Sequence, residues 1–312
     1  AALNGATLSV GGNELSVLGA ASTTFNGAYT GTSLGTIANF GSGTLELTGD
    51  GSGFTGVMGA AGAGGEMAIT GAGTTRAAVV VGDFGATFST DGGAILASNA
   101  VLAVDGEATF TGSETVGSIT NGSPDGNAIG IITLTGAGTL LTVTGEASAM
   151  NPTSINGTNG LVTGDGTLNI TGGSFNVGAT GNVLTATTVG ASGTVVNDGQ
   201  MTDVSNAGTV TNNGTGNILG TLTNTGAGGG SSSGTITTLA HDSTGTFSSS
   251  GLITNGVTVT DGTFTNTGTI SNGITNSAQV NAEGFIDGAM ENQTGGTFTV
   301  TGALVASDTF NN

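Results

Sequence analysis

The chain has 312 residues, of which 63 are glycine, and its 20 acidic residues stand against one Lys or Arg, so the net charge is −19. Nucleic acid and anionic membrane surfaces are bound through clustered Lys and Arg, and this balance argues against both classes of partner. The absence of cysteine excludes a disulfide framework and a thiolate metal site.

Short strands are predicted along the whole chain. Residues 44–48, 167–171 and 297–301 alternate apolar side chains with Thr, Asn or Glu, which is the pattern of a half-buried strand. Helix-forming residues in a 3.6-residue rhythm are nearly missing. No apolar run reaches the roughly 18 residues that a transmembrane helix needs. The aromatic share is only 4%, so we expect a thin, elongated core.

Two segments differ in regularity. Residues 1–190 are a less regular Gly/Ala-rich segment, with a Gly/Ala stretch at 59–65 and a loop at 122–127. Residues 191–312 carry regular Asn/Gly/Thr repeats. We predict one continuous solenoid from which loops project, and a flexible hinge at 226–233 is the alternative.

Internal repeats in the second segment determine the predicted architecture. The stretch 252–258 recurs 17 residues later as 269–275, and a third copy at 285–291 follows at a spacing of 16 from Ile270 to Ile286. This periodicity predicts an all-β solenoid with parallel strands and about 15 to 20 residues per coil. At about 17 residues per coil the chain would make about 18 coils.

A second repeated unit places Asn two residues after an apolar residue, and Gly follows several of the turns. Stacked coils would align these residues, so we expect them to form turns and side-chain ladders. The predicted turn and ladder residues are Asn206, Asn224, Asn255, Asn266, Asn272, Asn276, Asn292, Gly256, Gly273 and Gly288.

The sequence offers few candidates for chemistry. Arg76 is the single possible base for a lyase, and Asp105 with Glu107 is a possible glycosidase pair. His241–Asp242 resembles part of a catalytic triad, but no Gly-x-Ser-x-Gly elbow accompanies it. We therefore predict no enzyme activity, no cofactor and no metal site. Stacking that brings distant carboxylates together and single Ca²⁺ ions at loops remain as alternatives.

One family resemblance emerges from the residues themselves. Residues 43–56, Gly-Thr-Leu-Glu-Leu-Thr-Gly-Asp-Gly-Ser-Gly-Phe-Thr-Gly, resemble the repeat of bacterial autotransporter passenger domains, and the Asn-x-Gly-Thr-apolar run of 191–312 is similar to repeats in those proteins and in large surface adhesins. The resemblance implies a right-handed parallel β-helix outside a Gram-negative cell or on its outer surface. Such proteins usually end in a membrane barrel, whereas this sequence ends at 308–312 after ordinary repeats.

Strand-like sequence runs from Ala6 to Ala306 without a capping helix, so both ends are expected to be uncapped. We predict a structural protein of a bacterial surface that builds a fibre, filament or surface layer by end-to-end stacking. The alternative is an adhesin that presents loops such as 121–128 to a host or surface glycan or to extracellular matrix. A polysaccharide-processing enzyme and an ice-binding surface of Thr ladders rank below both. The chain itself, which starts at Ala1 without a leader, is expected to be a processed mature chain or an excerpt.

Overall fold

The computed structural model describes residues 2–3, 7–61, 64–70, 74–75, 78–81, 85–91, 95–96, 100–121, 130–136, 138–144, 153–155 and 160–312. Within these residues every regular element is a β-strand, and no helix is present. Arg76 and the predicted loop at 122–127 lie outside the described residues.

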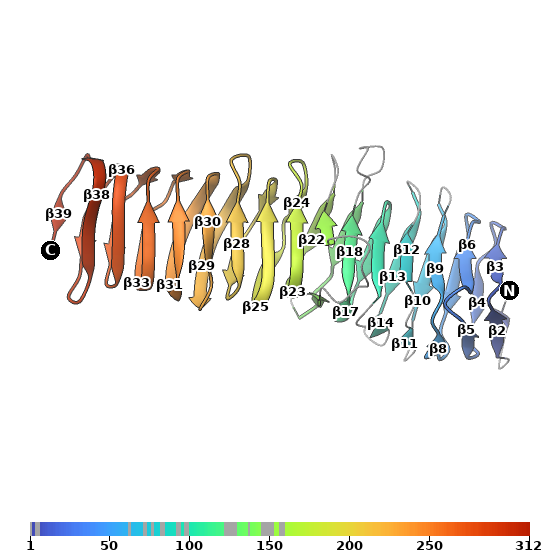
Figure 1. Cartoon of the computed structure of the whole chain (residues 1–312). Helices are drawn as coiled ribbons and strands as arrows, with labels where there is room; N and C mark the ends of the chain where they lie inside the picture. Colours follow the sequence, from blue (N-terminus) through green and yellow to red (C-terminus); the bar gives the residue numbers. More distant parts are fainter. Residues whose placement is uncertain are drawn as a thin grey trace. The chain divides into compact units, whose positions relative to one another are not determined.

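The chain folds as a β-solenoid of about 14 turns with about 19 residues per turn. Most strands pair with the corresponding strands of neighbouring coils, and every described pair is parallel (Figure 1). The predicted fold class, an all-β parallel β-helix with coils of 15 to 20 residues, is therefore confirmed.

The coils divide into two compact units. Unit 1 comprises Ala1–Asn169 and Thr180–Thr185, and unit 2 comprises Ile170–Ala179 and Ala186–Asn312. The strands of unit 1 are β1 (Ala2–Leu3), β2 (Leu8–Gly11), β3 (Glu14–Val17), β4 (Thr23–Phe25), β5 (Tyr29–Gly31), β6 (Thr36–Asn39), β7 (Thr44–Leu47), β8 (Gly53–Phe54), β9 (Val57–Ala60), β10 (Glu66–Ile69), β11 (Thr74–Thr75), β12 (Ala78–Val81), β13 (Thr87–Thr90), β14 (Ile95–Leu96), β15 (Val101–Val104), β16 (Glu107–Phe110), β17 (Glu114–Val116), β18 (Ser118–Asn121), β19 (Ile131–Leu134), β20 (Leu140–Val143), β21 (Thr153–Ile155), β22 (Leu161–Gly164) and β24 (Asn182–Val183).

Unit 2 has fewer and longer strands. They are β23 (Thr167–Val177), whose first residues belong to unit 1, β25 (Ala186–Asn197), β26 (Gln200–Met201), β27 (Val204–Asn206), β28 (Thr209–Asn212), β29 (Asn217–Gly226), β30 (Gly229–Ser232), β31 (Thr235–Ser249), β32 (Leu252–Ile253), β33 (Val257–Asn266), β34 (Thr269–Ser271), β35 (Ile274–Asn276), β36 (Gln279–Asp287), β37 (Met290–Asn292), β38 (Thr297–Ala306) and β39 (Phe310–Asn311).

Coil length differs along the chain, and this corrects the predicted number of coils. In unit 1, Phe110 pairs with Leu134, 24 positions later, and Ile132 pairs with Val162, 30 positions later. These coils exceed the 17 residues expected from the repeats of unit 2, so about 14 turns replace the predicted 18. The strands β16, β19 and β22 that these long coils connect remain paired residue by residue.

The repeats of unit 2 stack as the sequence predicts. Ile253 pairs with Ile270, and Ile270 pairs with Ile286, which confirms the spacings of 17 and 16. Inward-facing residues thereby form columns along the coil stack, and full burial of each aliphatic side chain contributes roughly 1.5–3 kcal/mol. The isoleucine column consists of Ile218, Ile236, Ile253, Ile270 and Ile286, each no more than 1% exposed.

The Gly-Gly-Ser segment of unit 2 forms strand β30, which pairs with β28 on one side and β31 on the other. Gly230 occupies the core column between Val210 and Phe247. Its φ is 138°, and a Cβ there would collide with the carbonyl oxygen of Val210. Glycine at this position thus lets the strand continue where a side chain would not fit.

Candidate functional site

Buried side-chain amides line one corner of the unit 2 coils. In-register pairing brings the residues of this asparagine column together: Asn206, Asn224, His241, Val259, Asn276 and Asn292. Four of the predicted ladder residues, Asn206, Asn224, Asn276 and Asn292, are in this set. Asn206, Asn224 and Asn276 are fully buried.

The amides of Asn206 and Asn276 each close their own turn and also bond the next coil. Asn206 Oδ1 accepts the Gly208 N–H at 3.0 Å, and Asn206 Nδ2 donates to Asn224 Oδ1 at 2.8 Å. Asn276 Oδ1 likewise accepts the Ala278 N–H at 3.0 Å, while its Nδ2 donates to Asn292 Oδ1 at 2.7 Å. A buried polar group without a hydrogen-bond partner lowers stability by about 1–3 kcal/mol. Because Oδ1 and Nδ2 of these side chains are both hydrogen-bonded, the corner avoids this cost.

A second asparagine column runs along another corner of the same unit. It contains Asn197, Asn212, Ser232, Ser249 and Asn266 in register. The sequence analysis named only Asn266, whose Nδ2 donates to the carbonyl of Glu283 in the next coil at 2.9 Å. Asn197 and Asn212 were missed, although each follows an apolar residue by two positions, which is the pattern used for the others.

The remaining predicted residues form turns and take no part in either column; Asn255 and Asn272 are exposed, whereas Gly256 and Gly273 are buried. Asn255–Gly256 and Asn272–Gly273 occupy equivalent turns of successive coils, and Gly288 follows Asp287 in the next turn. Asn272 has a φ of 64°, and Gly256, Gly273 and Gly288 have φ values of 85°, 78° and 106°. Asn and Gly tolerate this left-handed backbone better than other residues, which explains their recurrence here.

His241 takes the place of an asparagine in its column. Its Nδ1 accepts from Asn224 Nδ2 at 3.3 Å, and its Nε2 lies 3.3 Å from the carbonyl of Gly245. A neutral ring with its proton on Nε2 satisfies both contacts, because Nδ1 is then an acceptor and Nε2 a donor. Burial lowers the pKa of His241, against the opposing effects of the Gly245 carbonyl, Asp261 and Asp242.

Glu114 is a buried carboxyl group in unit 1, with 2% of its surface exposed. Its Oε2 accepts the backbone N–H of Leu96 at 2.7 Å. Burial raises the pKa of Glu114 to about 7, although the Leu96 N–H and the Thr90 hydroxyl favour the charged form. The group is thus balanced between its neutral and ionised states near neutral pH.

The residues considered for catalysis that the structure describes are Asp105, Glu107, His241 and Asp242. Asp105 lies between β15 and β16 and Glu107 begins β16, both at least partly exposed to solvent. His241 is buried whereas the adjacent Asp242 is exposed, as expected for neighbours in a strand. Among the described residues no group of three or more His, Asp or Glu side chains is placed to hold a metal ion.

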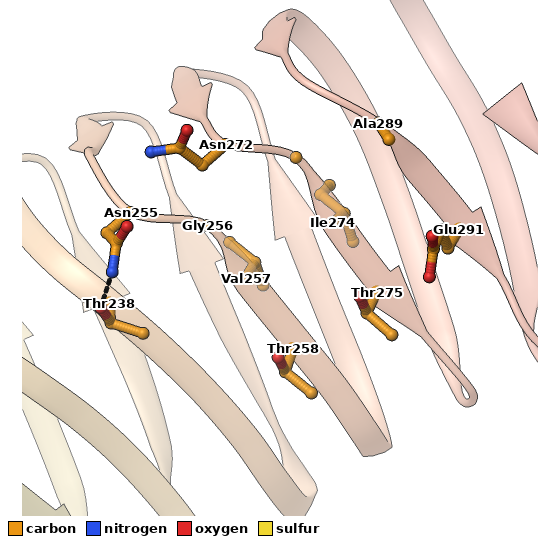
Figure 2. A pocket seen from close by; sticks show the side chains of 11 residues that line it. Thr238, Asn255, Gly256, Val257, Thr258, Asn272, Ile274, Thr275, Ala289 and Glu291 are labelled. Carbon is orange, nitrogen blue, oxygen red and sulfur yellow. Dashed lines mark hydrogen bonds between the residues drawn. The ribbon is translucent and has the colours of Figure 1, made fainter. Parts of the chain in front are cut away.

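A shallow polar groove of about 250 Å³ spans four successive coils of unit 2 (Figure 2). Outward-facing Thr258, Thr275 and Glu291 lie in register on β33, β35 and β37. The turns containing Asn255 and Asn272 line the same groove, and Asn255 Nδ2 donates to Thr238 Oγ1 at 3.3 Å. The full lining is Thr238, Asn255, Gly256, Val257, Thr258, Asn272, Gly273, Ile274, Thr275, Ala289 and Glu291.

Comparison of the chain with known protein families, curated proteins and solved structures finds no match. Over the part of the chain that the structure describes, no helix is long and apolar enough to cross a membrane.

Proposed function

We propose that this chain is a structural β-solenoid of the outer surface or surroundings of a Gram-negative bacterium, and that copies of it stack end to end into a fibre, filament or surface layer. The observation that carries the proposal is the parallel pairing of successive coils, which β38 and β39 continue. A further coil can pair with these strands in the same way, whichever chain supplies it.

Two exposed apolar side chains of the coil formed by β38 and β39, Val300 and Phe310, continue columns that the preceding coils bury. Val300 continues the column of Asn266 and Ala282, and Phe310 continues the column of Ile274 and Met290. Val300 is 56% exposed and Phe310 48% exposed, whereas Ala282 is fully buried and Met290 is 3% exposed. A further coil in the same register would cover these apolar groups and pair the free strand edge.

Under the proposal, a second copy of the chain supplies such a coil. Parallel pairing repeats the same hydrogen bonds at each step of about 4.8 Å, so the contact is head-to-tail and does not close on itself. Despite the net charge of −19, residues 291–312 include only two charged side chains, Glu291 and Asp308, which limits repulsion at this contact.

Two features of composition support a location outside the cell. The fold stands without cysteine, and its strands are held by repetitive backbone pairing. The single Lys or Arg leaves one site for trypsin-like proteases. The likeness of 43–56 to autotransporter passenger repeats supports the same location.

Sedimentation and electron microscopy of the 312-residue chain over a range of concentrations test the stacking. We expect linear assemblies that grow with concentration, and we expect the double variant Val300→Asp/Phe310→Asp to stay monomeric. Leu219→Asp is the matched control, because Leu219 is 50% exposed on the outside of β29 and should not affect stacking. A chain that remains monomeric at every concentration contradicts the proposal, as does equal assembly of the double variant.

A further inference from the structure

The polar groove on unit 2 carries hydrogen-bonding groups that the fold does not use. Thr258, Thr275 and Glu291 have no side-chain hydrogen bond to any other described residue. Asn255 and Asn272 donate through Nδ2 to Thr238 and to the carbonyl of Thr254, which leaves their carbonyl oxygens available. The groove therefore has two hydroxyls, two amide carbonyls and one carboxylate with spare capacity.

The charge of the groove restricts what it can bind. Its lining contains no Lys, Arg or His, so an anionic ligand would meet acceptors and one carboxylate without a compensating cation. Acceptors outnumber obligate donors, so a ligand rich in hydroxyl donors satisfies them best. A neutral polyol has this chemistry, since each of its hydroxyls both donates and accepts.

The spacing of the groups favours an elongated ligand. Thr258, Thr275 and Glu291 are successive partners in the parallel ladder, so they recur about 4.8 Å apart along the coil stack. The turns of Asn255 and Asn272 repeat alongside with the same step. A single small molecule would meet one coil, whereas a linear chain lying across the strands would meet all three and add their contributions.

Glycine at the turns keeps the groove open. Gly256 and Gly273 line it with positive φ values of 85° and 78°, and neither contributes a side chain. A Cβ on Gly273 would collide with the carbonyl oxygen of Ala289 in the next turn. The open groove and the close stacking of the turns thus both depend on glycine at these positions.

From these observations we infer that the groove of Thr258, Thr275, Glu291, Asn255 and Asn272 is a binding site for a linear, neutral oligosaccharide that lies across three coils of unit 2. The residues of this site are not those of the 121–128 loop, on which glycan binding was predicted from the sequence. They also differ from Val300 and Phe310, although Glu291 pairs with Asn311 of β39. Variants at the two sets of residues therefore test the two proposals separately.

Ligand-observed NMR titrations of the whole chain test the inference. The probes are two neutral linear oligosaccharides, cellohexaose and chitohexaose, with oligogalacturonate as the anionic comparison and oligolysine as the cationic one. We expect at least one neutral probe to bind with a dissociation constant on the order of 1 mM, and we expect the anionic probe not to bind. In a ¹⁵N-labelled chain the amides of Gly256 and Gly273 should shift on binding.

Paired variants locate the site. Thr258→Val/Thr275→Val removes two hydroxyls at nearly constant volume and should weaken binding by about 10-fold, given the usual contribution of a hydrogen bond. Thr246→Val/Thr263→Val is the matched control, because these threonines are also in register on adjacent coils but lie outside the groove. Circular dichroism checks that both variants keep the fold.

Several results would overturn the inference. One such result is that neither neutral oligosaccharide binds, and another is that the groove variant and the control variant bind the same oligosaccharide equally tightly. Binding of oligolysine alone would make the groove a cation site through Glu291, and binding of oligogalacturonate alone would place the site elsewhere.

Discussion

Replacing Glu114 with Gln removes the only carboxyl group that the structure describes as buried, and its effect should depend strongly on pH. The folded-state pKa is raised from 4.5 to about 7, which means that the folded chain binds this proton more tightly than the unfolded chain. The stability that Glu114 contributes is therefore fully present below pH 4.5 and is lost as the pH rises through about 7.

The magnitude follows from the shift. One pKa unit corresponds to about 1.4 kcal/mol, so ionisation of Glu114 destabilises unit 1 by about 3 kcal/mol above pH 7. The Gln side chain keeps an acceptor for the Leu96 N–H and adds no charge. Glu114→Gln should thus leave stability nearly unchanged at pH 4.5 and raise it by up to about 3 kcal/mol at pH 8.5.

Urea unfolding of both proteins at several pH values, followed by far-ultraviolet circular dichroism, measures this difference. The exposed Glu107 on the neighbouring strand provides the control, and Glu107→Gln should keep the pH profile of the parent chain. The reasoning is refuted if the profiles of Glu114→Gln and the parent run parallel between pH 4.5 and 8.5.

Three further substitutions test other parts of the structure. The pKa of His241 is lowered in the folded chain, so the stability that this residue contributes is present above pH 6.5 and is lost as the pH falls through the folded pKa. His241→Asn should reduce this sensitivity to acid. The measurement is the urea midpoint, which should drop less between pH 7.5 and pH 4.5 in the variant than in the parent chain. Gly273→Ala should lower the free energy of unfolding in urea by about 1–3 kcal/mol, because φ at this position is 78° and the new Cβ would meet the Ala289 carbonyl. Gly214→Ala should be nearly neutral, because a Cβ there would have nothing within 4 Å. Equal effects of the two substitutions would contradict the explanation given for the turns. Asn276→Ala should destabilise unit 2 by about 1–3 kcal/mol because the Ala278 N–H and the Asn292 amide lose their buried partner, and the exposed Asn255→Ala should change stability much less in the same thermal or urea melts.

Much of the fold was predictable because the coil length of a solenoid appears in the sequence as the spacing between its repeats. The three copies at 252–258, 269–275 and 285–291 stack in the register that their spacing implies, with Ile253, Ile270 and Ile286 in one column. The coil count was wrong because unit 1 has longer coils, and residues between strands carry no periodic signal that reveals their number.

The candidate site was only partly predictable for a related reason. Asn206 and Asn224 share a visible pattern, but the place of His241 in the same column becomes evident only once the register of β29 and β31 is known. The groove likewise depends on successive coils meeting side by side, and no single stretch of sequence contains Thr258, Thr275 and Glu291 together. The sequence analysis did not single out Glu114, because its burial becomes evident only in the folded structure.

The tolerance of coil length has a consequence for how such a chain can change over generations. Coils here range from 15 positions between Asn197 and Asn212 to 34 between Thr120 and Ser154, while the strands of successive coils remain paired in parallel. Residues gained or lost at a corner alter only the surface at that point, because the core columns above and below are unaffected. Corners are therefore sites where new sequence, including a grafted epitope or a binding loop, can be inserted without redesigning the protein that carries it.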